Sequence, residues 1–548
     1  MASRFAPRPR LTSASSSFSH NVEAIDEVLD AQSRRQSASR HNNKSFAARY
    51  QRAKNGLITF GKFIGPGFMV AVAYIDPGNY ATDVAAGASY QFRLLFVVLL
   101  SNIFAIFLQS LSIKLGTVSG LNLAEACRAF LPPWLNYVLY FMAEAAIIAT
   151  DIAEVIGTAV AINLLVPQIP LVAGCALSIL EVMAILFFYD PSGSMRGLRA
   201  FEFVVMLLVL AVVVCFCIQL SLIQNTSAAD VFRGYLPSAV LVERTALYQA
   251  CGILGATVMP HSLYLGSGIV QARLLDFDRQ SGLLPEEVDS AASSTTYGES
   301  SIKKVYMPSV TAIRHSMKYS VAELVICLFT FALFVNSAIL IVAGAALYGS
   351  PEAVDADLFG IHRLLSKSIS PIAGTVFALA LLFSGMSAGI VCTIAGQMVS
   401  EGALNWTLRP WLRRLVTRSI SIVPSIVIAA AVGREGLDAA LNGSQVALSI
   451  VLPFITAPLI WFTSVDRYMT VRPGMARFGV LGENEESAEG RGLLARLRGC
   501  FGEEVGEREG EQGVKMANGW VVTWFGVFVW LVMAVMNVAN LVLLGKGT

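Results

Sequence analysis

The sequence predicts an all-α integral membrane protein, because it combines a very apolar composition with repeated apolar segments of membrane-spanning length. Hydrophobic residues make up 55% of its 548 residues, charged residues make up only 14%, and the mean hydropathy is +0.62. A soluble globular chain carries about 25% charged residues, so the missing charge indicates a surface that faces lipid. A membrane β-barrel would instead show shorter segments of alternating polarity.

Eleven apolar segments follow one another along the chain, and most reach the roughly 20 residues that a helix needs to cross the hydrocarbon core. They lie at about 57–82, 93–117, 134–165, 169–189, 199–224, 245–274, 318–347, 369–402, 415–432, 444–465 and 519–545. The tail before them (1–55) is rich in Ser and Arg and poor in large apolar residues. This composition predicts a disordered segment, too long and too polar for a signal peptide.

Basic residues orient the predicted spans, since cytoplasmic loops carry an excess of Lys and Arg. Lys114, Arg196, Lys303 and Arg413 fall on the same side as the Arg-rich tail if the spans alternate in direction. The sequence therefore predicts a cytoplasmic N-terminus. The expected organisation is a disordered cytoplasmic tail (1–55), two five-helix repeats (56–224 and 245–465), a cytoplasmic insert in the second repeat (275–317), a cytoplasmic linker (466–518) and a terminal transmembrane helix (519–548).

Spans one and six share an unusual feature, a proline beside polar residues in the middle of an apolar segment. The first carries the sequence DPGN at 76–79, and the sixth carries MPH at 259–261. Five spans separate the two breaks, so the sixth span runs opposite to the first. Paired broken helices in corresponding positions indicate an inverted repeat with a binding site at the membrane midplane.

Each proline frees one backbone carbonyl, because proline has no amide hydrogen to donate to the residue four positions earlier. Pro77 leaves the Ala73 carbonyl without its helical partner, and Pro260 does the same to Ala256. Unpaired carbonyls cannot face lipid, so they must face protein or a polar cavity.

Together the two breaks offer the Asp76 carboxylate, the Asn79 amide oxygen, the Met259 thioether and the two freed carbonyl oxygens. Oxygen ligands alone would suit Mg²⁺, Ca²⁺ or Mn²⁺, whereas a thioether favours softer metals such as Fe²⁺ or Cd²⁺. Mg²⁺ keeps its waters and gains nothing from sulfur. The sequence therefore predicts a site for divalent transition-metal ions.

Other interpretations of these residues remain open from the sequence. An unpaired carboxylate in mid-membrane costs about 2.5–3.5 kcal/mol on the insertion scale, which favours a functional role for Asp76. Asn79 also fits the role of a helix cap, and Met259 also fits that of core filling. His261, the only histidine within a predicted span, is either a satisfied interior residue or a proton carrier beside the cation site.

The third span carries a second acidic feature. Glu144, Asp151 and Glu154 are spaced by seven and three residues, which places them on one helix face. Acidic residues in membrane helices mark proton relays, and Arg418 near the inner end of span nine is a candidate counter-charge. A static ion pair that only holds helices together is the alternative. The cysteines of the spans, Cys392 among them, show no paired spacing and are interpreted as small buried residues.

Several motifs together resemble the NRAMP family of divalent-metal transporters. They are the DPGN of span one, the A-x-x-M-P-H of span six and ATDIAEVIGTA in span three. The segment GMSAGIVCTIAGQMVSEG at 385–402 is similar to the transport signature of that family, and the resemblance extends over about 60–465. The sequence VAYIDPGNYATDVAAGAS is most similar to the corresponding segment of the fungal Smf-type manganese transporters.

The resemblance implies a LeuT-like fold, with spans one to five and six to ten as the inverted repeat and an eleventh span beyond it. The metal ligands that it implies are Asp76, Asn79, Met259, the carbonyls of Ala73 and Ala256 and, in some conformations, Gln445. The proton-pathway residues that it implies are Asp151, Glu154 and His261, with Arg418 as a basic partner. The sequence departs from many relatives at Val451, where they carry a second glutamine.

The predicted function is proton-coupled symport of divalent transition-metal ions (Mn²⁺, Fe²⁺, and also Cd²⁺, Co²⁺ and Zn²⁺) into the cytosol by alternating access. A nutrient sensor and a proton-coupled amino-acid transporter of the same fold are the alternatives. No enzyme activity and no cofactor are expected, since Mn²⁺ or Fe²⁺ is the substrate. The expected partners are metal ions, protons, the lipid bilayer and trafficking or ubiquitin machinery at the tails, with no nucleic acid. The expected location is the plasma membrane or an endosomal or vacuolar membrane.

Overall fold

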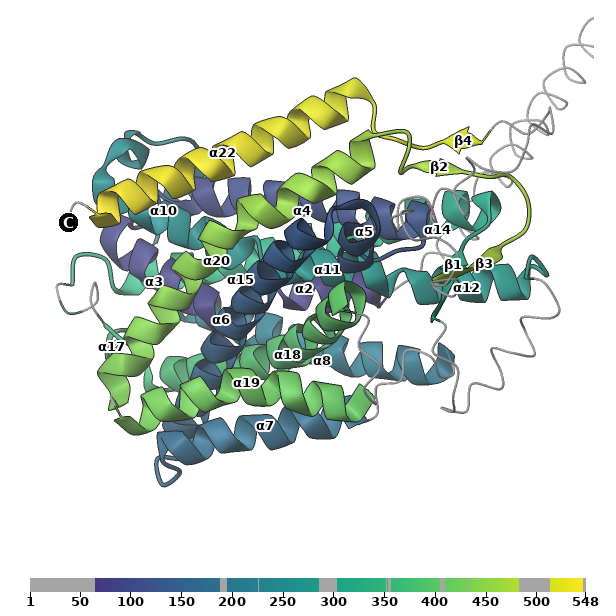
Figure 1. Cartoon of the computed structure of the whole chain (residues 1–548). Coiled ribbons are helices and arrows are strands. Elements are labelled where there is room, and N and C mark those ends of the chain that lie inside the picture. The colour runs from purple at the N-terminus through teal and green to yellow at the C-terminus, as the bar shows by residue number, and fades with distance from the viewer. Residues whose placement is uncertain are drawn as a thin grey trace, which may run out of the picture. The chain divides into compact units, whose positions relative to one another are not determined.

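The computed structural model describes residues 65–187, 195–224, 226–284, 303–350, 352, 356–404, 410–431, 433–481 and 513–545. The predicted tail (1–55) lies outside these ranges. Within them, eight helical segments are long and apolar enough to cross a membrane. Each of the eleven predicted spans corresponds to a helix or to consecutive helices (Figure 1), so the prediction of an all-α membrane protein is confirmed.

The first half of the chain supplies spans one to five. Its helices are α2 (Pro66–Val72), α3 (Pro77–Tyr90), α4 (Leu95–Ser119), α5 (Leu123–Phe130), α6 (Pro133–Leu165), α7 (Leu171–Phe187), α8 (Met195–Leu222) and α9 (Ala228–Gly234), followed by the 3₁₀ turn η1 (Ala239–Val242). Span one consists of α2 and α3, which are separated at the predicted proline break. It continues to Tyr90 rather than ending near residue 82, because the apolar and small residues of α3 remain helical beyond the predicted boundary.

The second half supplies the remaining spans. Its elements are α10 (Arg244–Thr257), α11 (Pro260–Ile269), α12 (Gln271–Gln280), β1 (Lys303–Met307), α14 (Val310–Cys327), the π-helical turn η2 (Leu328–Ala332), α15 (Leu333–Ala346), α17 (Leu358–Ser368), α18 (Pro371–Leu404), α19 (Pro410–Ala431), α20 (Gly433–Ser464), β2 (Thr470–Val471), β3 (Arg477–Leu481), β4 (Val514–Lys515) and α22 (Trp520–Gly545). Span six is broken between α10 and α11, as predicted.

The helix of span seven is longer than predicted. The helix of span seven begins at Val310 rather than near residue 318, because Ser309 caps it by accepting a hydrogen bond from the Ala312 amide. His315 therefore lies on a membrane-length helix and stacks on Phe277 with ring centroids 4.7 Å apart.

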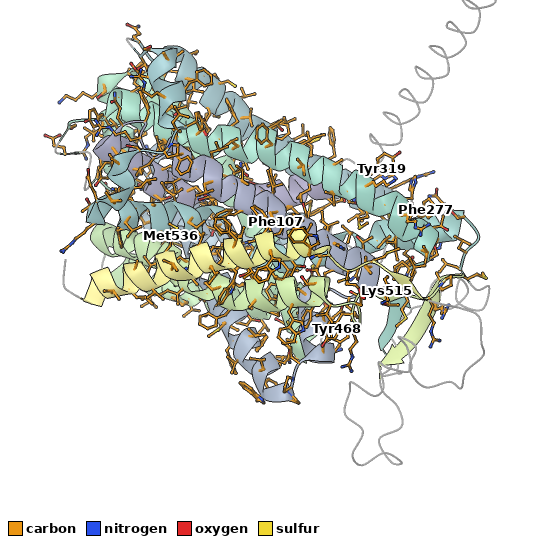
Figure 2. All side chains as sticks on the ribbon, turned by 90° about the horizontal axis from the view of Figure 1, so that it is seen from above. Phe107, Phe277, Tyr319, Tyr468, Lys515 and Met536 are labelled. Atoms are coloured by element: carbon orange, nitrogen blue, oxygen red, sulfur yellow. The ribbon has the colours of Figure 1, made fainter. Side chains whose placement is uncertain are left out.

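The interior is built around α6 and α18, which pack along each other, while α3 packs along α15 and against α10. Large apolar side chains remain exposed on α8 and α22, including Phe203, Trp524 and Phe528. Contiguous exposed apolar surface marks a membrane-facing region. Figure 2 shows Phe107 beneath α22, where its ring meets that of Phe525 edge-on at 4.7 Å.

Two short antiparallel pairings join the polar segments outside the spans. β1 pairs with β3 from Lys303–Leu481 to Met307–Arg477, and β2 pairs with β4. The insert before α14 is thus hydrogen-bonded to the segment that follows α20. The linker expected at 466–518 contains ordered strands at both of its ends.

Candidate functional site

Span one is unwound between Val72, where α2 ends, and Pro77, where α3 begins. Asp76 is the N-cap of α3. Its Oδ1 accepts hydrogen bonds from the backbone N–H of Asn79 at 3.2 Å and from Asn79 Nδ2 at 2.7 Å, and its Oδ2 accepts from the Gly78 N–H at 3.2 Å. Aspartate is a favoured N-cap, and proline is favoured at the first helical position. Asp76, and not Asn79, is therefore the N-cap of α3.

Side chains from distant helices satisfy the carbonyls of the unwound turn. The Tyr74 carbonyl accepts from Asn79 Nδ2 at 3.1 Å and from Asn336 Nδ2 of α15 at 3.0 Å. The Ile75 carbonyl accepts from Ser384 Oγ of α18 at 2.5 Å. These donors compensate the helical bonds that the break removes. The sequence analysis did not identify Asn336 or Ser384.

The second break is built in the same way. Met259 precedes Pro260, the first residue of α11, and is completely buried. Its carbonyl accepts from the Ser262 N–H at 3.2 Å and from Ser262 Oγ at 2.7 Å. Because Pro260 lacks an amide hydrogen, it cannot pair with the Ala256 carbonyl, just as the first break leaves Ala73 without its helical donor.

Three polar side chains connect the two breaks. The Tyr74 hydroxyl of the first lies 3.0 Å from Ser262 Oγ of the second. Gln109 Nε2 of α4 donates to both, at 2.9 Å to Tyr74 and 2.7 Å to Ser262. All three residues are buried, so the two unwound turns are joined by hydrogen bonds away from solvent.

Gln445 of α20 reaches the first break. A Cβ placed on Gly78 would overlap the Gln445 side-chain amide, so only glycine lets this amide approach the turn. Gln445 Oε1 and Asn79 Oδ1 are both buried and have no hydrogen-bond partner in the described part of the chain. Two amide oxygens without a donor thus lie at the turn that carries the Asp76 carboxylate, and oxygen ligands of this kind suit a divalent cation.

The acidic face of α6 lies beside the second break. His261 Nδ1 is 3.4 Å from Thr150 Oγ1, one residue before Asp151. The ligating atoms of Asp151, Glu154 and Cys392 of α18 all lie within 4.8 Å of one another, and all three residues are buried. The structure thus brings together two of the predicted acidic residues and adds a cysteine interpreted above as a small core residue.

The other predicted acidic residue lies farther along α6. Glu144 accepts a hydrogen bond from Ser400 Oγ of α18 at 2.8 Å, roughly 10 Å along the helix axis from Asp151. At the other end of the face, a Cβ on Gly157 would overlap the Pro77 ring, so α6 packs directly on the first break. The side chain of Arg418 lies outside the described residues.

Buried charged residues hold the beginning of α2. Glu323 of α14 accepts from the backbone N–H groups of Gly65 at 2.5 Å and Gly67 at 3.0 Å. Arg273 of α12 donates to both carboxylate oxygens of Glu202 of α8, at 3.1 and 2.9 Å. A Cβ on Gly65 would overlap this ion pair. We call Glu323, Arg273 and Glu202 the α2 clamp, and the sequence analysis did not identify it.

The sequence analysis also missed Asp83. It lies on α3, fully buried, and neither carboxylate oxygen has a hydrogen-bond partner among the residues that the structure describes. Its spacing of seven residues from Asp76 places both on one helix face. That spacing was available from the sequence and would have identified a second acidic residue on span one.

Known proteins resemble this chain over most of its length. The family model described as natural resistance-associated macrophage protein-like (Nramp) matches residues 67–473. Manganese transporter SMF1 of Saccharomyces cerevisiae is 51% identical over 93% of this chain and 90% of its own length. Iron transporter SMF3 of the same yeast is 52% identical over 75% and 83%, respectively.

A solved structure has the same fold. A crystal structure of a mutant manganese transporter of Eremococcus coleocola superposes with a TM-score of 0.62 at 27% identity, covering 90% of this chain and 96% of that one. The prediction of an inverted repeat of the LeuT type is confirmed, with broken first and sixth spans and a further span beyond the repeat. By its sequence, its two broken helices and these matches, the chain belongs to the Nramp family.

Proposed function

We propose that this protein is a proton-coupled symporter that moves divalent transition-metal ions into the cytosol by alternating access. The observation that carries the proposal is the pair of breaks joined through Tyr74 and Ser262. They provide a carboxylate, an amide oxygen and a thioether in one buried region. A soluble cofactor is not required, because the metal is the cargo.

The proposed metal ligands are Asp76, Asn79, Met259, the carbonyls of Ala73 and Ala256, and Gln445. In this structure the Asp76 carboxylate caps α3, so an incoming cation would compete with backbone amides for its oxygens. Asn79 Oδ1 and Gln445 Oε1 have no competing donor among the described residues. Mixed oxygen and sulfur ligands favour Mn²⁺, Fe²⁺, Cd²⁺, Co²⁺ and Zn²⁺ over Mg²⁺. The names of the relatives, manganese and iron transporters, support Mn²⁺ and Fe²⁺ as substrates.

Alternating access would act on the broken helices. Asp76 and Met259 have at most 1% of their surface exposed, so an ion reaches them only after the surrounding helices move. The α2 clamp and the Tyr74–Ser262 bond would both have to break before α2 swings away. Opening toward the other side would separate α3 and α10 from α20, where Gln445 packs on Gly78.

Protons would leave along α6. His261 meets α6 at Thr150, and Asp151 and Glu154 follow on the same helix. Glu144 extends this face farther, and Arg418 is its proposed basic partner. The basic residues of the loops support a cytoplasmic N-terminus, and the proposed location is the plasma membrane or an endosomal or vacuolar membrane.

The test is Mn²⁺ uptake into proteoliposomes loaded with a pH-sensitive dye. Asp76→Ala should abolish Mn²⁺ uptake, whereas Asp230→Ala, which removes a carboxylate from the exposed surface of α9, should not. Unchanged uptake by Asp76→Ala would refute the site. Wild-type uptake with no accompanying acidification would refute symport and leave metal transport standing. Met259→Ala should narrow the preference for Cd²⁺ over Ca²⁺, and an unchanged ratio would exclude the thioether as a ligand.

A further inference from the structure

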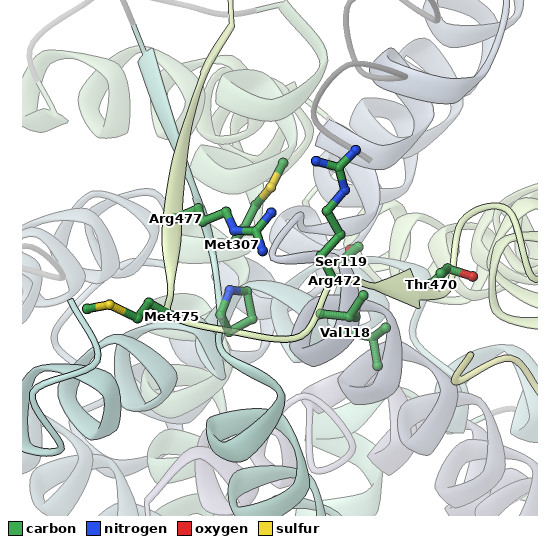
Figure 3. Close-up of a pocket in the computed structure, with 9 residues that line it drawn as sticks. Val118, Ser119, Met307, Thr470, Arg472, Met475 and Arg477 are labelled. Atoms are coloured by element: carbon green, nitrogen blue, oxygen red, sulfur yellow. The ribbon is translucent and has the colours of Figure 1, made fainter. Parts of the chain in front are cut away.

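A cavity lies away from the two breaks, where α4 ends and the polar segments pair (Figure 3). It is a small hollow that is partly open to solvent. Three segments line it: the end of α4, the residues that join β1 to α14, and the chain from β2 to β3. The lining residues that carry the argument are Ser119, Met307, Thr470, Arg472 and Arg477.

The charge of this cavity is uniformly positive. Arg472 and Arg477 line it, and none of the other lining residues is acidic. Figure 3 shows both guanidinium groups on the same side of the loop that joins β2 to β3. Neither arginine has an ion pair among the residues that the structure describes. Asp466, an acidic residue earlier in the same segment, pairs with Lys515 instead, at 3.0 Å.

The hydroxyl groups that line the cavity already donate hydrogen bonds within the protein. The Ser119 hydroxyl donates to the Leu115 carbonyl at 2.7 Å, and the Thr470 hydroxyl donates to the Asp466 carbonyl at 2.7 Å. One nitrogen of Arg477 donates to the Pro473 carbonyl at 3.0 Å, which fixes the orientation of its guanidinium. The remaining guanidinium N–H groups are therefore the donors that a ligand would meet.

We propose that this cavity binds a phosphate monoester through Arg472 and Arg477. Guanidinium groups present parallel N–H donors that match phosphate oxygens, and two of them balance the charge of a doubly ionised phosphate. The cavity lies at the end of span two, on the side of the membrane where span one begins. Under the proposed topology this is the cytoplasmic side, where basic pockets at the membrane surface bind phosphorylated lipid headgroups.

The phosphate could come from a lipid headgroup or from a soluble ester, and the chemistry of the cavity is the same for both. The lining comes from the end of α4, the residues that join β1 to α14, and the segment after α20. A bound phosphate would thus connect three segments that belong to different spans. The inference rests on the proposed topology only for the side from which the ligand arrives.

The experiment uses the full chain purified into nanodiscs. One set contains phosphatidylcholine alone, a second adds a phosphatidylinositol monophosphate, and inorganic phosphate is titrated into the first set. Binding is measured by native mass spectrometry and by the thermal midpoint of unfolding. The double variant Arg472→Gln/Arg477→Gln should weaken binding by at least about tenfold. Arg472→Lys/Arg477→Lys should weaken it less, because charge remains without the planar donors.

Arg467→Gln is the matched control, since Arg467 is an exposed arginine of the same segment that does not line the cavity. Binding confined to the lipid-containing nanodiscs identifies a headgroup, and binding of inorganic phosphate as well identifies a site for soluble esters. No binding of either probe, or equal binding by the double glutamine variant, overturns the proposal. Mn²⁺ uptake is measured on the same preparations, so loss of binding with intact uptake, or the reverse, separates this site from the transport site.

Discussion

The Tyr74 hydroxyl donates its hydrogen to Ser262 Oγ, 3.0 Å away. The direction follows from the neighbouring hydrogen bonds, because Ser262 donates its only hydroxyl hydrogen to the Met259 carbonyl at 2.7 Å. Gln109 Nε2 of α4 donates the second hydrogen bond that Ser262 Oγ accepts. The two breaks are therefore joined by an ordered chain of donors that begins on span one and ends on the carbonyl of a proposed metal ligand.

Removing the first donor should loosen this connection. Tyr74→Phe deletes the bond to Ser262 and an acceptor of Gln109, and each net hydrogen bond contributes about 1 kcal/mol. We expect faster amide hydrogen exchange in α2 and α11, by roughly fivefold or more for that free energy. Tyr137→Phe is the control, because this hydroxyl belongs to an exposed residue of α6. Equal exchange in the two variants would contradict the role of Tyr74.

Substitutions of Gly78 and Gln445 should have non-additive effects on Mn²⁺ uptake. Gly78→Ala places a methyl group where the Gln445 amide now lies, and Gln445→Ala removes that amide. Each should slow Mn²⁺ uptake by roughly fivefold, the equivalent of about 1 kcal/mol for one lost polar ligand. Because both act on the same group, the double variant should be no slower than either single one. Multiplicative losses in the uptake assay would show that the two residues act independently.

Substitution of Glu154 should reduce proton entry more than Mn²⁺ uptake. Glu154→Gln keeps the size of the side chain but removes its ability to hold a proton and release it. We expect Mn²⁺ uptake to continue while the number of protons entering per Mn²⁺ falls, read from dye and isotope in the same vesicles. Asp230→Asn, at an exposed carboxylate of α9, is the control and should leave the ratio unchanged. A normal ratio in Glu154→Gln would remove it from the proton pathway.

The α2 clamp should restrain the beginning of α2. In Glu323→Gln, the carboxamide keeps one acceptor oxygen and loses the charge that two amide N–H groups share. Hydrogen bonds to charged groups contribute about 1.5–3 kcal/mol, so exchange of the Gly65 and Gly67 amides should accelerate. Lys318→Gln, which alters an exposed residue of the same helix, is the control. Unchanged exchange at both glycines would mean that Glu323 does not hold α2.

The sequence was sufficient for the spans and for the breaks, because membrane helices need long apolar segments and a mid-membrane proline has a defined local effect. It was insufficient for the groups that satisfy the unwound turns. Asn336 and Ser384 reach the carbonyls of Tyr74 and Ile75 from 262 and 309 residues away. Nothing in their local sequence shows which turn they will meet.

The same limit applies to the polar segments outside the spans and to the cap of α3. The pairing of β1 with β3 joins residues 170 or more positions apart, and short polar strands carry little apolar periodicity to predict them. Asp76 was expected to be a metal ligand, yet in the closed structure it also caps α3. The sequence analysis predicted the metal-binding role of Asp76 and did not predict its role as the cap of α3.

The last helix supports a part of the transporter that proline weakens. α20, which carries Gln445, contains Pro453 and Pro458 in its interior, so two of its backbone bonds are missing. α22 runs alongside it (Figure 1), and Trp530 Nε1 donates to the Pro453 carbonyl at 2.8 Å. The eleventh span, although outside the repeat, therefore reinforces α20 from the outside, next to one of the two prolines that interrupt its backbone hydrogen bonds.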